Sequence, residues 1–246
     1  MTHNILKIVT ICLVMFITSH PECSGQFNIK KLKDATKSLT GAKSGGFSKE
    51  EAGKAIKEAL EKGTTSGVAI VSKPDGYLKR PEIKIPFPPE AQKVEKKLRE
   101  VGMGKKVDDV VVSINRAAED AAVAAKNIFI DAIKAMTIKD AINIIKGEDN
   151  AATEYLRRTV GAQLKASFMP KIRVSLEKVN ATKYWSDVIN TYNKIPFVEK
   201  VNPDLAEYVT DKAIYGLFVM IAKEELKIRQ DPIARTTDLL KKVFGG

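Results

Sequence analysis

Residues 107–136 read VDDVVVSINRAAEDAAVAAKNIFIDAIKAM, and this stretch decides the fold class. Small and apolar residues recur in it at steps of four and three: Val107, Val111, Ile114, Ala118, Ala121, Ala125, Ile128 and Ala132. This spacing keeps them on one side of an α-helix. Three successive alanines in the series leave room for a neighbouring helix to approach closely. We therefore predict one long central helix over residues 107–136, packed inside a helical bundle.

Helical signals continue on both sides of this stretch. Ser48 and Glu51 form a capping box that predicts a helix to about residue 60, interrupted by the glycines of residues 63–67. Residues 210–230 are apolar on all sides at their centre, which predicts a buried C-terminal helix. The expected architecture is an all-α, single-domain bundle over residues 48–246.

The first 25 residues have the layout of a secretory leader. Lys7 precedes an apolar run over residues 8–17, and Cys23-Ser24-Gly25 places small residues where a signal peptidase cuts. We expect a signal peptide at residues 1–25, then a basic arm at residues 26–47. The expected location is secreted or extracellular, and periplasmic if the host is bacterial. The run is too short to span a membrane, and we expect no transmembrane segment elsewhere.

Removal of this leader would leave a chain without histidine or cysteine. His3, His20, Cys12 and Cys23 are the only such residues, and all four precede residue 26. Nucleophilic catalysis with histidine, thiol chemistry and metal sites built on nitrogen or sulfur are then excluded. We expect no cofactor and no metal, and we favour a protein that is not an enzyme.

The charge is strongly positive, with 41 Lys and Arg against 30 Asp and Glu and a net charge of +11. Lysines, spread along the whole chain, greatly outnumber arginines, whereas dedicated nucleic-acid readers favour arginine with stacking aromatics. The pattern indicates a solvated surface, or diffuse attraction to an anionic matrix, polysaccharide, mineral or membrane surface. Nucleic acid is not an expected partner.

Several blocks of sequence, in a fixed order over about residues 50–245, resemble the family known as domain of unknown function 4197. They are KPDGYL at 73–78, IKIP at 83–86, NRAAE at 115–119, AATEYLR at 151–157, YNKIP at 192–196, YVT at 208–210, EELKIR at 224–229, DP at 231–232 and RTTDLL at 235–240. The resemblance implies an all-helical fold and, for many members, an export signal. It implies no activity, substrate or cofactor.

Two groups of polar residues are candidate ligand-binding or catalytic positions. Asn115, Arg116 and Glu119 lie on the predicted long helix, as surface ion pairs or as a polar pocket beside the alanines. Glu224 shares a helical stripe with apolar residues, so it is expected in the core, paired to an arginine such as Arg157 or Arg235. The neighbouring Glu225 is expected to form an ordinary surface pair with Arg229.

Two further motifs complete the candidate set. Arg235-Thr236-Thr237-Asp238 concentrates polar groups at a predicted helix start, where they cap the helix or bind an anion. Asn180-Ala181-Thr182 is a glycosylation sequon, usable in a eukaryotic host.

Three functions remain open on the sequence alone. The first is a secreted, non-enzymatic protein that binds through a basic surface or has a structural role. The second is a carboxylate-dependent hydrolase that uses Glu119 and Glu224. The third is a carrier of an apolar small ligand held between helices.

Overall fold

The computed structural model describes residues 48–244 except 101, 179, 195, 198–199, 201 and 203. The predicted leader (1–25) and arm (26–47) lie outside the described residues. The described part belongs to one compact unit and contains helices, turns and loops but no strand. The predicted all-α class is confirmed.

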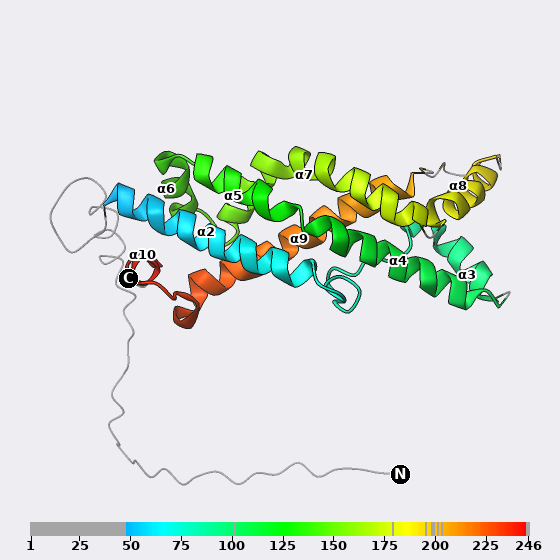
Figure 1. Cartoon of the computed structure of the whole chain (residues 1–246), viewed down its shortest axis with the longest axis horizontal. Helices are drawn as coiled ribbons and strands as arrows, with labels where there is room; N and C mark the ends of the chain where they lie inside the picture. The colour runs from blue at the N-terminus through cyan, green and yellow to red at the C-terminus, as the bar shows by residue number, and fades with distance from the viewer. Residues whose placement is uncertain are drawn as a thin grey trace, which may run out of the picture. The chain divides into compact units, whose positions relative to one another are not determined.

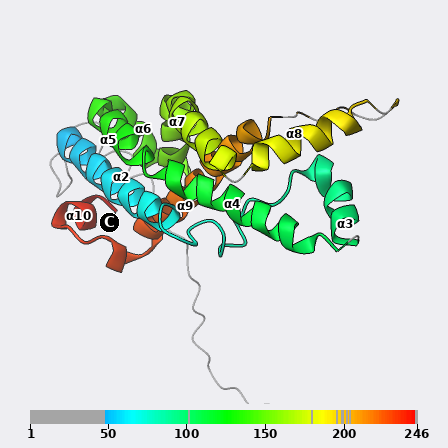
Figure 2. The ribbon, with the colours of Figure 1, turned by 45° about the vertical axis from the view of Figure 1, so that its right-hand side comes forward.

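The α-helices follow one another along the chain with short connections. They are α2 (Lys49–Val71), α3 (Gln92–Glu100), α4 (Gly104–Ala122), α5 (Ala125–Ala135), α6 (Ile138–Lys146), α7 (Ala151–Lys178), α8 (Ala181–Tyr192), α9 (Leu205–Gln230) and α10 (Asp238–Phe244). Single 3-10 turns, η2 (Pro89–Ala91) and η3 (Pro232–Ala234), precede α3 and α10. Helices α3 and α8 lie at one end of the unit, and α6 and α10 lie at the other (Figures 1 and 2).

Helix α9 is the centre of the bundle. It packs against α2 on one side and α7 on another, and it also contacts α4. Its side chains Ala213, Leu217 and Phe218 are fully buried, and the Phe218 ring meets Phe129 of α5 edge-on at 5.9 Å. The buried C-terminal helix predicted over residues 210–230 is confirmed.

The single long helix predicted over residues 107–136 is wrong in its continuity, because the chain breaks at Val123 and Ala124. The Ala124 N–H bonds the carbonyl of Ala121, three residues back, at 3.1 Å. The break lets α4 pack mainly on α7 while α5 turns toward α2. The small residues still face the core as predicted, since the alanines of α4 and the first alanine of α5 are buried.

The interruption predicted at residues 63–67 is also wrong, because α2 runs through both glycines. A Cβ on Gly67 would lie 3.1 Å from the Ile221 side chain, and one on Gly63 would lie 3.7 Å from the Cβ of Glu224. Both glycines therefore face α9, which crosses α2 closely and in the opposite direction. The stabilisation from this close packing offsets the roughly 1 kcal/mol that each glycine costs a helix.

The longest described helix is α7, with 28 residues and Pro170 inside it. A proline at this point deprives the carbonyl of Ala166 of its helical partner. Both Ala166 and Pro170 are exposed, so water can satisfy that carbonyl.

Candidate functional site

The first candidate group, Asn115, Arg116 and Glu119, lies together on α4. Asn115 and Glu119 are buried, with exposed fractions of 0% and 3%. All three side chains face the connection between α2 and α3, residues 73–87, which we call the strap. The strap has no regular helix of its own. Turn hydrogen bonds such as Gly76 N–H to the Lys73 carbonyl satisfy part of its backbone, and its other backbone groups need partners from elsewhere.

Glu119 and Arg116 bind the beginning of the strap. The Glu119 carboxylate accepts hydrogen bonds from the backbone N–H groups of Tyr77 (3.1 Å) and Leu78 (3.3 Å). Arg116 donates to Glu119 at 2.6 Å and to the Asp75 carboxylate at 2.7 Å. Hydrogen bonds from Lys79 and Arg116 lower the pKa of Asp75. Because three donors occupy the Glu119 carboxylate, its role is to fix the strap to α4.

Asn115 binds the far part of the strap through its side-chain amide, which pairs with the N–H and the carbonyl of one residue as a neighbouring backbone would. Its amide oxygen accepts from the Ile85 N–H, and its amide nitrogen donates to the Ile85 carbonyl, both at 2.9 Å. The same nitrogen donates to the Val111 carbonyl at 2.8 Å. The interpretation of these residues as surface ion pairs is wrong for Asn115 and Glu119, because the strap covers that side of α4.

Tyr77 anchors the strap to α9. Its ring is fully buried, and its hydroxyl donates to the Ala213 carbonyl at 2.6 Å. Burial raises the pKa of this hydroxyl well above its usual value. Gly216 makes the space for it, because a Cβ there would lie 2.7 Å from the Tyr77 ring.

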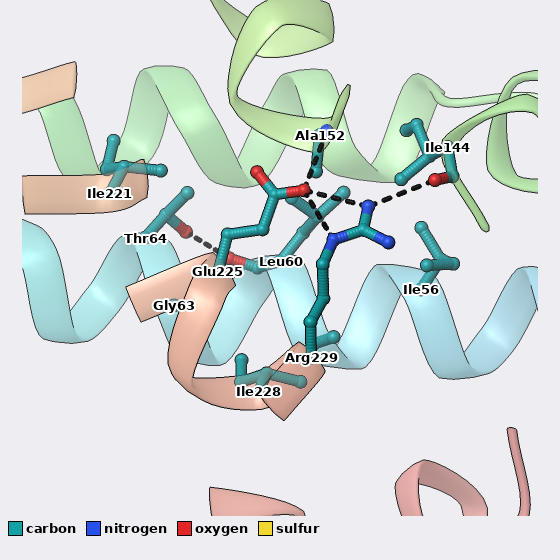
Figure 3. A pocket seen from close by; sticks show the side chains of 11 residues that line it. Ile56, Leu60, Gly63, Thr64, Ile144, Ala152, Ile221, Glu225, Ile228 and Arg229 are labelled. Carbon is teal, nitrogen blue, oxygen red and sulfur yellow. Dashed lines mark hydrogen bonds and ion pairs between the residues drawn. The ribbon is translucent and has the colours of Figure 1, made fainter. Parts of the chain in front are cut away.

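The second group centres on Glu225 of α9, which is 8% exposed (Figure 3). Its carboxylate accepts from the backbone N–H groups of Ala152 (3.0 Å) and Thr153 (2.8 Å), and from the Thr153 hydroxyl (2.7 Å). It therefore caps the N-terminus of α7, where unpaired N–H groups and the helix dipole favour a negative charge.

Arg229 completes this group. It donates to Glu225 through Nε (3.0 Å) and Nη2 (2.8 Å), and Nη2 also reaches the Ile144 carbonyl at the end of α6 at 3.0 Å. Beside the pair lies a cavity of about 30 Å³, which Ile56, Leu60 and Ile228 also line (Figure 3). A space of this size holds one or two water molecules.

The prediction of Glu225 as a surface residue was therefore wrong, whereas that of Glu224 was wrong only in its partner. The Cβ of Glu224 faces α2 beside Gly63, as its stripe indicated, and its side chain is 14% exposed. Its carboxylate accepts from the Ser66 hydroxyl at 2.9 Å and pairs with the exposed Lys227. Glu225 is buried because α7 covers a second side of α9 that the apolar pattern did not reveal.

The other candidates have separate roles. Arg235 caps the end of α9 by donating to the carbonyls of Ile228 (3.1 Å) and Arg229 (2.7 Å). Thr237 accepts from the Leu240 N–H at 3.2 Å, which confirms it as the cap of α10.

Neighbouring polar residues make surface contacts. Thr236 accepts from Lys62 at 2.7 Å, and Asp238 pairs with Lys241 at 3.5 Å. Arg157 lies over the Phe218 ring at 4.6 Å and also contacts Glu154.

The structure thus brings Glu225, Arg229 and Arg235 together at one end of α9, and Asn115, Arg116 and Glu119 together under the strap. Glu119 and Glu224 contact different segments and share no hydrogen bond. Sequence reasoning missed Glu225, Thr153 and Tyr77 as interior polar anchors, and Asp75 as a half-buried one. The spacing of Glu225 and Arg229 was visible, but such a pair is usually a surface pair.

Asn180 is exposed in the turn between α7 and α8, with a left-handed φ of 55°. In the part of the chain that the structure describes, no group of three or more histidine, cysteine or carboxylate residues is arranged to hold a metal ion. Of the helices described, none combines the length and the apolar character needed to cross a membrane.

Fold and site together define an all-helical protein whose interior charges hold its own connections and helix ends. The chain belongs to the family described as protein of unknown function (DUF4197), which matches residues 46–245. This confirms the resemblance found in the sequence. Comparisons with curated proteins and with solved structures found no match.

Proposed function

We propose that this protein is an exported, non-catalytic binding protein that associates with anionic surfaces through exposed lysines. The observation that carries the proposal is how the charges are distributed. The buried carboxylates of Glu119 and Glu225 each accept several internal hydrogen bonds, which leaves them poorly available for acid–base chemistry. The surplus of positive charge lies outside, where it can meet a partner.

Exposed lysines on α2, α5 and α6 illustrate this surplus. Lys54, Lys126, Lys139 and Lys146 are exposed and have no carboxylate within ion-pair distance among the described residues. Diffuse cationic surfaces of this kind attract polyanions with a strong dependence on ionic strength. The predicted leader supports an extracellular or periplasmic setting, where such partners include matrix, mineral and membrane surfaces.

The geometry gives less support to the two other functions. A hydrolase would need Glu119 and Glu224 to face one substrate, whereas they contact different segments. A carrier of an apolar molecule would need a cavity of about 300 Å³ or more. The cavity beside Glu225 has about a tenth of that volume, and the larger hollow of about 430 Å³ beside Leu226 and Gln230 is an open depression of the surface.

The test is retention on an anionic matrix, such as heparin resin, with elution by a salt gradient. Changing Lys126, Lys139 and Lys146 to Gln should lower the salt concentration needed for elution. The matched control changes Lys79, Lys105 and Lys241, which are paired with carboxylates, and removes the same formal charge. Elution of the unchanged protein at or below physiological ionic strength would refute the proposal.

A further inference from the structure

The outer side of α9 carries an apolar stripe, of which Val219 packs against the core while other members are exposed in the described part of the chain. Tyr215 is 55% exposed, Leu226 is 38% exposed, and Ile233 of the following turn is 86% exposed. Val219 and Ala222 are half-buried between them. The spacing of four, three and four residues places Tyr215, Val219, Ala222 and Leu226 on one side of α9, and Ile233 lies in the turn η3 that follows. We call these five side chains the α9 stripe.

Charged side chains of both signs border the α9 stripe, since Asp211 and Asp231 are exposed beside it as well as lysines. Lys212, Lys223 and Lys227 are exposed on α9. Lys223 and Lys227 pair with Glu82 and Glu224, whereas Lys212 has no carboxylate partner among the described residues. The long stems of these lysines can follow an apolar surface while their ammonium groups stay at its polar edge.

The neighbouring part of α7 is open beside the stripe. Gly161 lies between Arg157, which contacts Phe218, and Lys165, which pairs with Asp211, so it lies next to the middle of α9. A Cβ on Gly161 would meet no atom within 4 Å. Internal packing therefore gives no reason for a glycine here, unlike at Gly63 and Gly67.

We propose that the α9 stripe seats the protein on an anionic lipid surface, with its aliphatic side chains in the interface and its lysines at the headgroups. This inference rests on the proposed function and names its partner. Polysaccharide or mineral would engage the lysines but gain nothing from Val219, Leu226 and Ile233. A lipid surface can bind all three kinds of side chain together: aliphatic residues, a tyrosine at the interface and flanking lysines.

The experiment uses the absence of cysteine after residue 23. In the full chain with Cys12→Ser and Cys23→Ser, a single cysteine replaces Leu226 and carries an environment-sensitive nitrobenzoxadiazole label. The matched control places the label at Val123, which is 61% exposed and lies outside the stripe. Each protein is mixed with vesicles of phosphatidylcholine alone, or of phosphatidylcholine with phosphatidylglycerol. Flotation measures binding, and label emission reports contact with lipid.

The expected result is flotation that requires phosphatidylglycerol, with a blue shift at position 226 and little or none at position 123. Combining Leu226→Ser with Ile233→Ser should weaken binding about tenfold, which corresponds to about 1.4 kcal/mol. Flotation with equal shifts at both positions, or with no shift at 226, would overturn the α9 stripe as the docking face and leave the proposed function standing.

Two other outcomes distinguish lipid from the other partners. Retention on heparin without flotation on vesicles would refute only the lipid partner. Failure to bind either heparin or vesicles would refute the proposed function as well. A dimer in sedimentation velocity that Leu226→Ser dissociates would assign the stripe to a second copy and refute the inference.

Discussion

Changing Glu225 to Gln should destabilise the fold far more than changing Glu224 to Gln, although the two residues are adjacent. A glutamine at 225 keeps one acceptor oxygen, so either Ala152 or Thr153 loses the partner of its buried N–H. It also removes the negative charge next to Arg229, whose side chain is only 13% exposed. Breaking such a buried pair costs about 3 kcal/mol or slightly more.

The Glu224→Gln change should remove much less stabilisation. Its amide oxygen can still accept from Ser66, and its ion-pair partner Lys227 is 60% exposed. Exposed pairs contribute at most about 1 kcal/mol. In a domain of this size each kcal/mol shifts Tm by about 2–4 °C, so the expected losses are about 6–12 °C for Glu225→Gln and under about 4 °C for Glu224→Gln.

The assay is urea and thermal unfolding followed by far-UV circular dichroism. Glu154→Gln, in an exposed pair with Arg157, is a further control with an expected loss under about 1 kcal/mol. The Arg229→Met change alone and combined with Glu225→Gln completes a double-mutant cycle, in which the two residues should couple by more than about 1 kcal/mol. Equal losses for the 224 and 225 variants, or a coupling near zero, would refute the assignment of Glu225 as the buried cap of α7.

Three further changes test other parts of the structure. Gly216→Ala forces a methyl group to 2.7 Å from the Tyr77 ring and should cost about 1–3 kcal/mol in urea unfolding; an unchanged midpoint would contradict the packing of the strap on α9. Gly161→Ala places a methyl group in open space within a helix and should raise stability by about 0.5–1 kcal/mol, whereas a loss would show that something already packs there. The pKa of Asp75 is lower in the folded protein than its unfolded value of 3.8, so the ionised carboxylate stabilises the fold. This stabilisation is present above pH 3.8 and is lost as the pH falls through the folded pKa. Asp75→Asn should therefore be less stable than the unchanged protein at neutral pH, with the gap closing below pH 3.8; a gap that persists in acid would argue against the ion pairs.

The sequence was sufficient for the helical class because its local signals agree with the tertiary packing. The capping box predicted at Ser48 forms, and Thr137 and Asp204, which are residue types that favour the N-cap position, cap α6 and α9. The alanines of the predicted series, Ala118, Ala121, Ala125 and Ala132, are buried as their spacing indicated. These features depend on neighbours within one or two helical turns, which a single sequence displays directly.

The errors share one physical cause, which is that a residue's role changes when a second helix covers it. Gly63 and Gly67 were interpreted as helix breakers, yet they allow α9 to approach α2, and this contact is invisible in the sequence of α2 alone. Glu225 looked like a surface residue because Arg229, four residues later, offers an ordinary ion pair. Only the N-terminus of α7, more than seventy residues earlier, places that pair in the interior.

The strap shows the same limit for the candidate site. Asn115 and Glu119 were found by their polar character on an apolar helix, but whether they bind a ligand or the protein itself depends on where residues 73–87 run. A buried polar side chain needs a partner in either case. Because the strap's own backbone N–H groups at Tyr77, Leu78 and Ile85 supply that partner, the polar residues of this interior hold a connecting segment of the protein itself.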